Sequence, residues 1–423
     1  MSLTVCFYED SNYINFYPLT HLRPAYCLRA GIVPLYRRAE RFFKPTNWAF
    51  LTRTRLAGLT GEQFREIPVN IIKRHDSDVL FINGRIRDYG NLPELVKSTR
   101  LTTVFKNSGE TVAVLFQNEI LQKVPPVATV DMFLKIRTEQ VEEIAVTGTS
   151  ATLYNHLWEL VEDIEPSITA DFEYLRPTFN QKAVNRVHAQ AALVAPDRIH
   201  LDGDVEIQPG AVLDASHGPI YIGPNSRVEA HTAIFGPCFI GANSVAVAGK
   251  ITGSSIGHTC RVGGEVEESI FHAYVNKYHA GFIGHSYVGP WVNFGAMTTN
   301  SDLKNNYSNI RVTLNGESVD TGSIKVGSFI GDHTKFGIGT LLNTGINIGV
   351  CCNIFGGTLV TDKEVLSFQW GNSQGYQKYL FAKALETARR TAERRHTALS
   401  GREEEVLKDI YDGNASGDGV INF

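Results

Sequence analysis

Apolar residues in the second half of the chain repeat with a period of six. From Ile324 onward an aliphatic or aromatic residue occupies every sixth position, and small residues such as Ser328 and Thr334 follow most of them four places later. The apolar members of this run are Ile324, Ile330, Phe336, Leu342, Ile348, Ile354 and Val360. An earlier run with the same spacing consists of Ile222, Val228, Ile234, Ile240 and Ala246. Because six is a multiple of the two-residue strand period, each run returns to one inward face.

This period predicts a triangular β-solenoid. Three six-residue units close one coil of about 18 residues, and stacked coils bury a continuous apolar column that no single coil could hide. An antiparallel sandwich with glycine-rich turns would not keep this register. The stretch from about Val187 to Val360 resembles the left-handed parallel β-helix of the hexapeptide-repeat acyltransferases, and we assign residues 187–365 to this domain. The resemblance implies a homotrimer that binds acyl-CoA between neighbouring subunits.

The six-residue register is lost twice, between Val262 and Ile283 and again between Asn300 and Ser323. Insertions in a solenoid become loops on one face, where the fixed coils can present binding and catalytic side chains. Basic residues in or beside these segments suit anionic groups, and asparagines suit hydroxyls. These residues are Lys277, Lys304, Arg311, Asn293, Asn300, Asn305 and Asn306. Their content predicts a sugar phosphate as the ligand.

Residues 277–307, KYHAGFIGHSYVGPWVNFGAMTTNSDLKNNY, resemble the acetyltransferase domain of the GlmU-type bifunctional enzymes, which acetylate glucosamine 1-phosphate and then uridylylate it. The matching features are the His279 segment with Ile283 and Gly284, the VNFGA segment, and the TTN segment. The resemblance implies that His279 is the catalytic base. It implies an acceptor site made of Lys277, Asn293, Asn300, Asp302, Lys304 and Tyr307. Phe282 stands where the family has tyrosine, and SDLKNNY matches only loosely, so the sugar is less well specified.

The chemistry also points to a histidine. Acetyl transfer from a thioester to a sugar amine needs a base of near-neutral pKa, and backbone N–H groups of a glycine-rich coil can hold the developing oxyanion. His279 therefore fits, with His285 and then His272 as the next candidates. The alternative is that His279 is a polar turn residue with no chemical role.

Asp332, Thr334 and Lys335 interrupt an apolar run in the closing coils. We predict that they contact acetyl-CoA, since a lysine can meet a CoA phosphate as a point charge. Solvated corner positions are the alternative explanation.

Residues 1–180 alternate short apolar runs with helix-like segments, which predicts an α/β domain with a mostly parallel sheet and a helical linker. Residues 17–38, YPLTHLRPAYCLRAGIVPLYRR, resemble the signature of the sugar-phosphate nucleotidylyltransferases. The matching positions are Pro18, Leu19, Thr20, Arg23, Pro24, Gly31, Pro34 and Leu35. The resemblance implies transfer of a nucleotide from UTP or dTTP to a sugar 1-phosphate, with Mg²⁺ as a candidate ion.

Three departures from that family change the expected site. The position of the family's phosphate-binding glycine loop reads YEDSNYINF, Ala25 replaces a lysine, and Arg85 in INGRI replaces a metal-binding aspartate. Arginine has no acceptor for a cation, but it makes bidentate contacts to phosphate. We therefore predict an arginine-based phosphate site and no protein-bound metal. The predicted site consists of Arg23, Arg29, Gly31, Asn83 and Arg85. Salt bridges at a domain face are the alternative role for these arginines.

Composition narrows the ligand class. The formal charge of −4 and pI of about 6.4 give no basic field for nucleic acid. No apolar run is long enough for a membrane helix, and the first residues do not read as a secretion signal, so we expect a cytoplasmic protein. The six cysteines lack a CxxC pair and are expected to be reduced packing residues.

Helical segments flank the solenoid. A helical linker over residues 155–175 should break at Pro166, with Trp158 and Leu160 packed inward. Residues 366–423 form a C-terminal helical extension, in which Tyr379, Leu380, Ala384, Leu385 and Ala388 have helical spacing. Its arginines, Arg389, Arg390, Arg394 and Arg395, are interpreted as a solvated face.

Three hypotheses follow. The first is an enzyme of amino-sugar nucleotide synthesis with acetyl transfer on the solenoid and nucleotidyl transfer in the N-terminal domain. The second is a nucleotidyltransferase whose solenoid is purely structural, and the third is a non-catalytic binding or scaffold protein. His279 in an asparagine-rich segment favours the first over the second, because a structural solenoid needs neither feature.

Overall fold

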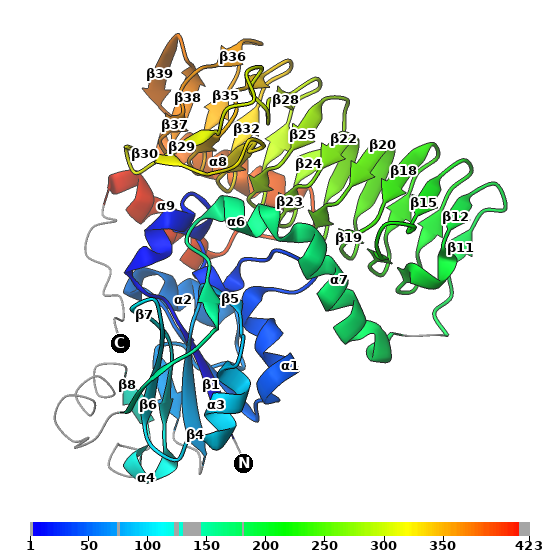
Figure 1. The fold of residues 1–423 in the computed structure, drawn as a ribbon. Coiled ribbons are helices and arrows are strands. Elements are labelled where there is room, and N and C mark those ends of the chain that lie inside the picture. Colours follow the sequence, from blue (N-terminus) through cyan, green and yellow to red (C-terminus); the bar gives the residue numbers. More distant parts are fainter. Residues whose placement is uncertain (1–2, 74–76, 122–126, 130–144, 180–181, 414–423) are drawn as a thin grey trace.

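The computed structural model describes residues 3–73, 77–121, 127–129, 145–179 and 182–413. It confirms the predicted combination of an α/β N-terminal domain, a left-handed β-solenoid of about 10 turns and a C-terminal helical segment. Figure 1 shows the solenoid lying across one end of the α/β domain, with helices α6 (Leu157–Glu162), α7 (Ile164–Leu175) and α9 (Gly401–Asp412) between the two. The linker and the C-terminal segment therefore both contribute to the junction.

The N-terminal domain is built on one mixed sheet, in the order β2-β1-β4-β7-β6-β9. Strands β2, β1 and β4 are parallel, whereas β7 runs antiparallel to both β4 and β6. The bounds are β1 Leu3–Tyr8, β2 Asn47–Leu51, β4 Asp78–Asn83, β6 Thr103–Asn107, β7 Glu110–Phe116 and β9 Ala145–Gly148. The continuous apolar runs VCFY and VLFI are buried on both faces, as expected for central strands. The sheet thus brings the carboxyl ends of β1 and β4 side by side.

Helices and short strands complete this domain. The helices are α1 Glu40–Phe43, α2 Thr54–Gln63, α3 Leu92–Ser98 and α4 Asn118–Leu121. Two antiparallel pairs lie outside the main sheet, β3 Ile71–Lys73 with β8 Val127–Thr129 and β5 Ile86–Asp88 with β10 Thr152–Leu153. The segment between β1 and α1 is mostly 3₁₀ turns, including Ser11–Phe16 and Leu35–Ala39.

The linker forms two helices, α6 Leu157–Glu162 and α7 Ile164–Leu175. Trp158 and Leu160 are buried as predicted. The predicted break at Pro166 is wrong, because the helices separate at Asp163 and Pro166 lies in the first turn of α7. Proline is tolerated there since the first-turn N–H groups have no partner within the helix.

The solenoid has three faces of short parallel strands. The first face holds β11 Arg186–Val187, β14 Glu206–Ile207, β17 Arg227–Val228, β20 Val245–Thr252, β22 Arg261–Glu267, β24 Asn276–Lys277, β27 Asn293–Phe294, β32 Lys335–Phe336 and β35 Asn353–Ile354. The second holds β13 Ile199–Leu201, β16 Ile220–Ile222, β19 Cys238–Ile240, β21 Ser255–Ile256, β23 Ile270–Phe271, β26 Tyr287–Val288, β31 Ser328–Ile330, β34 Ile346–Ile348 and β37 Glu364–Val365. The third holds β12 Ala192–Val194, β15 Val212–Asp214, β18 Thr232–Phe235, β25 Phe282–Gly284, β28 Thr299–Asn300, β33 Leu341–Leu342 and β36 Leu359–Val360.

The six-residue pattern locates the solenoid core with one exception. All members of both runs except Ile324 belong to one buried apolar cluster. Ile324 is 47% exposed, because it lies at the end of an inserted hairpin and its coil resumes only at β31.

The first predicted insertion is not an insertion. Residues 262–283 form β22, β23, β24 and β25 in continuous parallel register with their neighbours. The coils here are shorter than three full hexads, which shifts the sequence period without producing a loop. As a result Lys277 takes the inward position opposite Val262.

The second predicted insertion is a hairpin, β29 Arg311–Leu314 and β30 Glu317–Asp320. Its Ile310, Val312 and Leu314 pack in one cluster with Trp158 and Val161 of α6. The hairpin therefore joins the solenoid to the linker.

The chain ends in the antiparallel pair β38 Gln369–Asn372 and β39 Gly375–Lys378, followed by α8 Phe381–Glu393 and α9 Gly401–Asp412. The prediction placed Tyr379 and Leu380 in this helix, but α8 begins at Phe381. Leu380 precedes α8 and is 65% exposed, and the buried stripe is Ala384, Ala388 and Ala392. α9 packs against α2 of the N-terminal domain through Val406 and Leu407.

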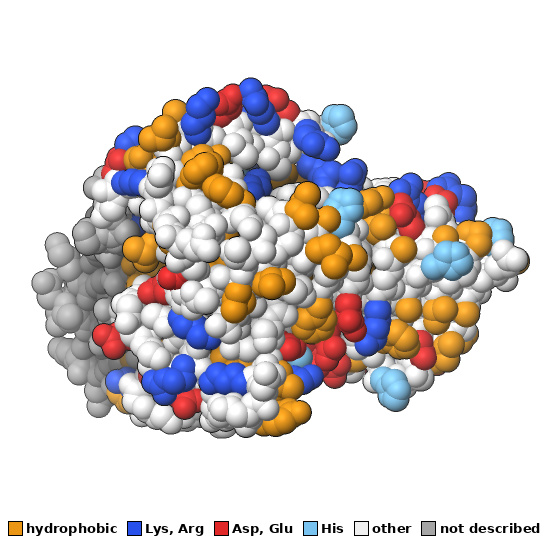
Figure 2. All heavy atoms as spheres, turned by 90° about the horizontal axis from the view of Figure 1, so that it is seen from above, with side chains coloured by type: hydrophobic (Ala, Val, Ile, Leu, Met, Phe, Trp, Pro, Cys, Tyr) orange, Lys and Arg blue, Asp and Glu red, His pale blue; other side chains and the backbone are white. Residues whose placement is uncertain are grey.

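Within the described residues, none of the helices combines the length and apolarity of a membrane span. On the face drawn in Figure 2, acidic and basic side chains are interspersed with apolar ones along the solenoid. All six cysteines are free and buried, which agrees with a packing role.

Candidate functional site

The carboxyl ends of β1 and β4 carry the charged cluster that stands where a nucleotide site was predicted. Arg85 Nε and Nη2 donate to the Asp10 carboxylate at 2.7–3.1 Å, and Nη2 also donates to Glu110 at 2.9 Å. Asn83 Nδ2 donates to Asp10 at 2.9 Å, and its Oδ1 accepts from the Arg85 backbone N–H. Arg85 is only 1% exposed. Its hydrogen bonds are therefore directed at protein groups, and the side chain is not open to a phosphate.

A second buried ion pair lies beside it, where the glycine loop of nucleotidylyltransferases was expected. The Glu9 carboxylate accepts from Arg53 Nε at 3.2 Å, from Thr52 Oγ1 at 2.6 Å and from the Ala25 backbone N–H at 3.0 Å. Both charged side chains are at most 1% exposed. The sequence pattern did not predict this ion pair. Its one indication in the sequence is Glu9, an acidic residue directly after a buried strand.

These two ion pairs determine whether the carboxylates at this edge could bind Mg²⁺. The carboxylates at this edge, Asp10, Glu9 and Glu110, all accept hydrogen bonds from arginine. A cation would have to compete with those guanidinium groups for the same oxygens. The residues present do not fit a magnesium ion, and no step is assigned to one.

The signature stretch docks on the solenoid instead of lining a phosphate site at the sheet. Arg23 forms a bidentate pair with Asp332, donating to Oδ1 at 3.0 Å and also to Oδ2, and both side chains are under 9% exposed. Gly31 lies so close to α7 that a Cβ would come within 2.8 Å of Ser167 and Asp171 atoms. Its carbonyl accepts from Ser255 Oγ at 2.6 Å. Arg23 and Gly31 therefore fix the domain junction.

Arg29 faces a cavity of about 480 Å³ at the same junction. Its guanidinium lies 5.7 Å above the Phe239 ring, and its backbone N–H donates to Tyr287 Oη. The cavity is also lined by Arg23, His258, His272 and Asp332. The structure thus brings Arg23 and Arg29 together here, whereas Asn83 and Arg85 belong to the cluster at the sheet.

His279 lies on the outer surface of the solenoid, after β24. Its side chain is exposed, and its backbone carbonyl accepts from Lys277 Nζ at 2.5 Å. Lys277 also donates to the Gly263 carbonyl at 3.1 Å and is 1% exposed. Lys277 thus points inward and anchors the His279 backbone, so it does not reach an acceptor at the surface.

The buried Lys277 makes a testable contribution to stability. Burial lowers the pKa of its ammonium group to about 8, below the value of about 10.4 in an unfolded chain. The folded state therefore holds this proton less tightly, so the group destabilises the fold below about pH 8 and the penalty disappears as pH rises to about 10. We expect Lys277→Met to lose that alkaline gain, worth about 3 kcal/mol. Thermal unfolding of both proteins across this range measures it, and parallel pH profiles would contradict the assignment.

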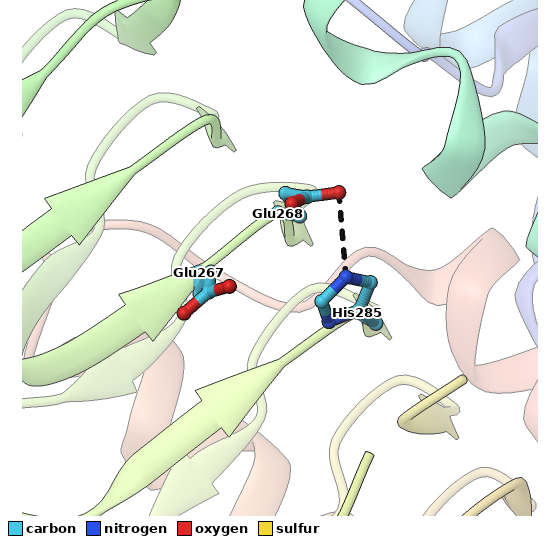
Figure 3. A group of neighbouring side chains, drawn as sticks. All are labelled: Glu267, Glu268 and His285. Carbon is cyan, nitrogen blue, oxygen red and sulfur yellow. Dashed lines mark ion pairs between the residues drawn. The ribbon is translucent and has the colours of Figure 1, made fainter. Parts of the chain in front are cut away.

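His285, the second candidate base, is held in an ion-pair cluster. Nδ1 lies 2.7 Å from Asp302 Oδ2. Nε2 lies 3.3 Å from Glu268 Oε2, the ion pair marked by the dashed line in Figure 3. Although burial opposes the charge, the hydrogen bonds to Asp302 and Glu268 raise the pKa of His285 to about 9. An imidazolium at neutral pH cannot accept a proton from an amine. His285 is therefore a structural cation and not the base.

The same cluster has the spacing of a metal site but not its chemistry. The ligand atoms of Glu267, Glu268 and His285 lie within 4.8 Å of one another (Figure 3). Metal binding requires a neutral imidazole, whereas both nitrogens of this ring face carboxylates. Lys325 Nζ lies 3.4 Å from Glu267 and supplies further positive charge. Each carboxylate of the cluster is thus paired with a cationic side chain of the protein.

His272, the third candidate, lines the junction cavity. Burial, followed by the charges of Arg23 and Arg29, holds its pKa well below the usual value. Its Nδ1 lies 3.4 Å from Tyr287 Oη. It is a neutral polar group of the junction.

The predicted acceptor residues are dispersed. Asn300 is buried and bridges two coils through Gly284 and Ser286, and Asp302 binds His285. Lys304 donates to the Asn309 carbonyl at 2.6 Å, and Tyr307 is 67% exposed. Asn293 Oδ1 accepts from Asn276 at 2.9 Å on the outer face. These residues do not converge with Lys277 on one pocket.

The predicted CoA residues also point in different directions. Asp332 binds Arg23, and Thr334 is buried with its hydroxyl donating to Gly349. Lys335 donates to the Trp291 carbonyl at 2.5 Å and lines a second cavity with Asn293. Burial lowers the pKa of Lys335 to about 8.

The N-terminal part of the chain matches a known family. Residues 5–178 match the family described as "Sugar nucleotidyl transferase". The matched residues are those of the N-terminal domain and the linker helices. The chain is also 27% identical over 166 residues to a protein of Sulfurisphaera tokodaii named bifunctional sugar-1-phosphate nucleotidylyltransferase/acetyltransferase, covering 38% of this chain and 36% of that protein. A protein of Methanococcus vannielii named bifunctional protein GlmU is 27% identical over 146 residues, 34% of this chain and 30% of that protein.

These matches cover about a third of the length of each relative. A solved UDP-N-acetylglucosamine acyltransferase from Campylobacter jejuni is 13% identical and aligns in full with 56% of this chain at a TM-score of 0.35. A TM-score that low carries no argument about the activity of this chain. The resemblance to GlmU-type proteins is confirmed by the sequence relatives, and their substrates are not transferred by it.

Proposed function

We propose that this protein is a transferase of nucleotide-sugar synthesis, which moves an acetyl group from acetyl-CoA to the amino group of a hexosamine 1-phosphate. One observation carries the proposal. His279 presents an exposed imidazole on a backbone fixed by buried Lys277, whereas His285 is ion-paired and His272 lines the junction cavity beside Arg23 and Arg29. His279 is thus the candidate base that can both move a proton and reach a ligand. The bifunctional names of two relatives support this reaction class.

In the proposed reaction the sugar nitrogen attacks the thioester carbonyl while His279 takes the proton from that nitrogen. The C–S bond then breaks, and the thiolate of CoA leaves and is protonated. Backbone N–H groups at the solenoid corners can hold the oxygen as negative charge develops on it. Acetyl-CoA is a co-substrate here, and no metal is needed.

Nucleotidyl transfer from UTP or dTTP to a sugar 1-phosphate is the second candidate. The similarity of residues 5–178 to sugar nucleotidyl transferases favours it. The engagement of Arg85 and Arg53 by carboxylates weighs against it, because these groups would have to exchange protein partners for phosphate. Acetyl transfer is therefore our first proposal.

A pair of assays tests the two reactions. Release of free thiol from acetyl-CoA is followed with glucosamine 1-phosphate, and with glucosamine as the matched acceptor lacking phosphate. We expect release with the phosphorylated acceptor; absence of release with every hexosamine phosphate contradicts acetyl transfer. Pyrophosphate release from UTP and dTTP with Mg²⁺ and sugar 1-phosphates measures nucleotidyl transfer separately.

We further propose a cytoplasmic homotrimer that acts on small molecules. Apolar side chains stay exposed on the closing coils, at Met297 (59%), Ile338 (74%), Leu341 (40%) and Leu359 (47%). Leu341 and Leu359 are register partners on adjacent strands, so they form a continuous apolar strip. Such strips are buried where subunits meet.

The strip gives an assembly prediction. We expect Leu341→Glu combined with Leu359→Glu to convert the trimer to monomers, because two carboxylates would lose their hydration in the interface. Analytical ultracentrifugation measures the mass, and Val187→Glu, at an exposed apolar position on the first coil, is the control. An unchanged oligomer in the double variant would remove this strip from the interface.

A further inference from the structure

A cavity of about 330 Å³ lies between the outer face of the solenoid and the end of α8. Arg261, Asn276, Asn293 and Lys335 follow one another along the ladder of the first face. Their ladder neighbours Val262 and Phe294 point into the core, so this row points outward. The residues after α8 close over the row and contribute Arg394 and Arg395.

Positive charge in this cavity lacks a counter-charge. Among the residues that the structure describes, those lining the cavity include Arg261, Arg394, Arg395 and Lys335 but no aspartate or glutamate. Other arginines of α8 are paired, Arg389 with Glu404 and Arg390 with Glu386. The pKa of Arg395 is lowered first by burial and then by Arg261 and Arg394, which is the mark of unrelieved repulsion.

The helix dipole explains only part of this arrangement. Basic residues at the end of α8 are favourable beside its last carbonyls. Arg261 comes from the solenoid, however, and its approach adds repulsion without touching that helix end. An anion held between the guanidinium groups would relieve it, because arginine binds phosphate through two parallel hydrogen bonds.

The uncharged lining indicates what the anion is attached to. Asn276 donates to Asn293 at 2.9 Å, which leaves amide groups of both residues able to bind hydroxyls. Tyr274 and Trp291 stack at 4.0 Å and form an apolar floor. Hydroxyl-binding amides beside a phosphate-binding group and an aromatic surface suit a phosphorylated sugar.

We propose that this cavity is a binding site for a sugar phosphate, whose phosphate lies among Arg261, Arg394 and Arg395 and whose hydroxyls face Asn276 and Asn293. His279 does not line this cavity. Binding here is therefore measured separately from acetyl transfer. The C-terminal extension acts as a clamp in this arrangement, since Arg394 and Arg395 follow α8 while the other partners belong to the solenoid.

Titration calorimetry on the full chain tests the site, with glucose 1-phosphate as the probe. Glucose, inorganic phosphate and UDP are the comparison ligands. We expect saturable binding of glucose 1-phosphate, weaker binding of inorganic phosphate, and none of glucose. Binding of UDP without glucose 1-phosphate would overturn the sugar phosphate assignment, and no saturable binding of any phosphate would overturn the site.

The variants locate the binding. Arg261→Gln and Arg395→Gln should each weaken glucose 1-phosphate binding roughly tenfold or more, as expected for loss of a charged hydrogen bond. Arg390→Gln on the same helix should leave it unchanged, since Arg390 pairs with Glu386 outside the cavity. Thermal unfolding checks folding, and Arg261→Lys is a milder second variant that keeps the charge. Wild-type affinity in the glutamine variants would overturn the proposal, whatever the acetyl transfer assay shows, because His279→Ala should still bind glucose 1-phosphate.

Discussion

Replacing His279 by alanine is expected to lower kcat/KM for acetyl transfer to a hexosamine 1-phosphate by about 10²–10⁴-fold, the usual contribution of a general base. Of the three candidate histidines, His279 is the one with an exposed ring: His285 is an imidazolium between two carboxylates, and His272 lines the junction cavity, where burial and the charges of Arg23 and Arg29 lower its pKa. Thiol release under saturating acetyl-CoA measures the change.

Controls separate chemistry from folding in this experiment. His188→Ala removes another exposed histidine of the solenoid and should keep wild-type activity. In the plot of acetyl transfer kcat/KM against pH, His279→Ala should lose the limb that reports the general base. A variant that is merely unfolded would instead lose activity by the same factor at every pH. Activity within about threefold of wild type in His279→Ala would exclude it as the base, since general bases contribute far more.

The second large effect is on stability. Arg23→Met is expected to cost about 3–5 kcal/mol, because it leaves the Asp332 carboxylate buried without its partner. Asp332→Asn should cost a similar amount by leaving Arg23 unpaired. The pair connects the N-terminal domain to the solenoid, so domain separation should accompany the loss.

A double-mutant cycle distinguishes the ion pair from general packing. Arg23→Met with Asp332→Leu should recover much of the loss, since both charges are removed together. Urea unfolding measures the free energies, and the exposed Arg37→Met, which loses only a surface pair with Glu40, is the control. Loss of less than about 1 kcal/mol in both single variants would show that the pair does not hold the junction.

The solenoid was predictable because its cause is local. The inward residues recur at a fixed spacing, so Ile330, Phe336 and Ile354 identify the core without any knowledge of distant contacts. The six-residue pattern failed around Lys277, because the coils there contain fewer than 18 residues and the inward positions no longer recur at every sixth residue. The sequence pattern therefore placed an insertion where the structure continues the ladder.

The arginines were not predictable in the same way, because their partners are distant in the chain. Arg23 and Asp332 were assigned to a phosphate site and a CoA site, yet they bind each other across 309 positions. Arg85 similarly turns to Asp10 and Glu110. Carboxylate and phosphate both accept two parallel hydrogen bonds from an arginine side chain. An arginine in the sequence therefore does not reveal which of the two anions it binds.

The same limit applies to Arg394 and Arg395. On the helix alone they resemble a solvated charged face, and their convergence with Arg261 appears only when α8 is laid on the solenoid. The arginine side chains indicate anion binding, but only their positions in the fold show that they converge on one cavity.

One measurement tests acetyl transfer most directly. The full chain is incubated with glucosamine 1-phosphate, acetyl-CoA, UTP and Mg²⁺, and the sugar products are analysed by mass spectrometry, with His279→Ala in parallel. We predict N-acetylglucosamine 1-phosphate with the wild-type chain and its formation at least about a hundredfold more slowly with His279→Ala. Uridylylated glucosamine without an acetyl group, or unchanged glucosamine 1-phosphate, would contradict the account.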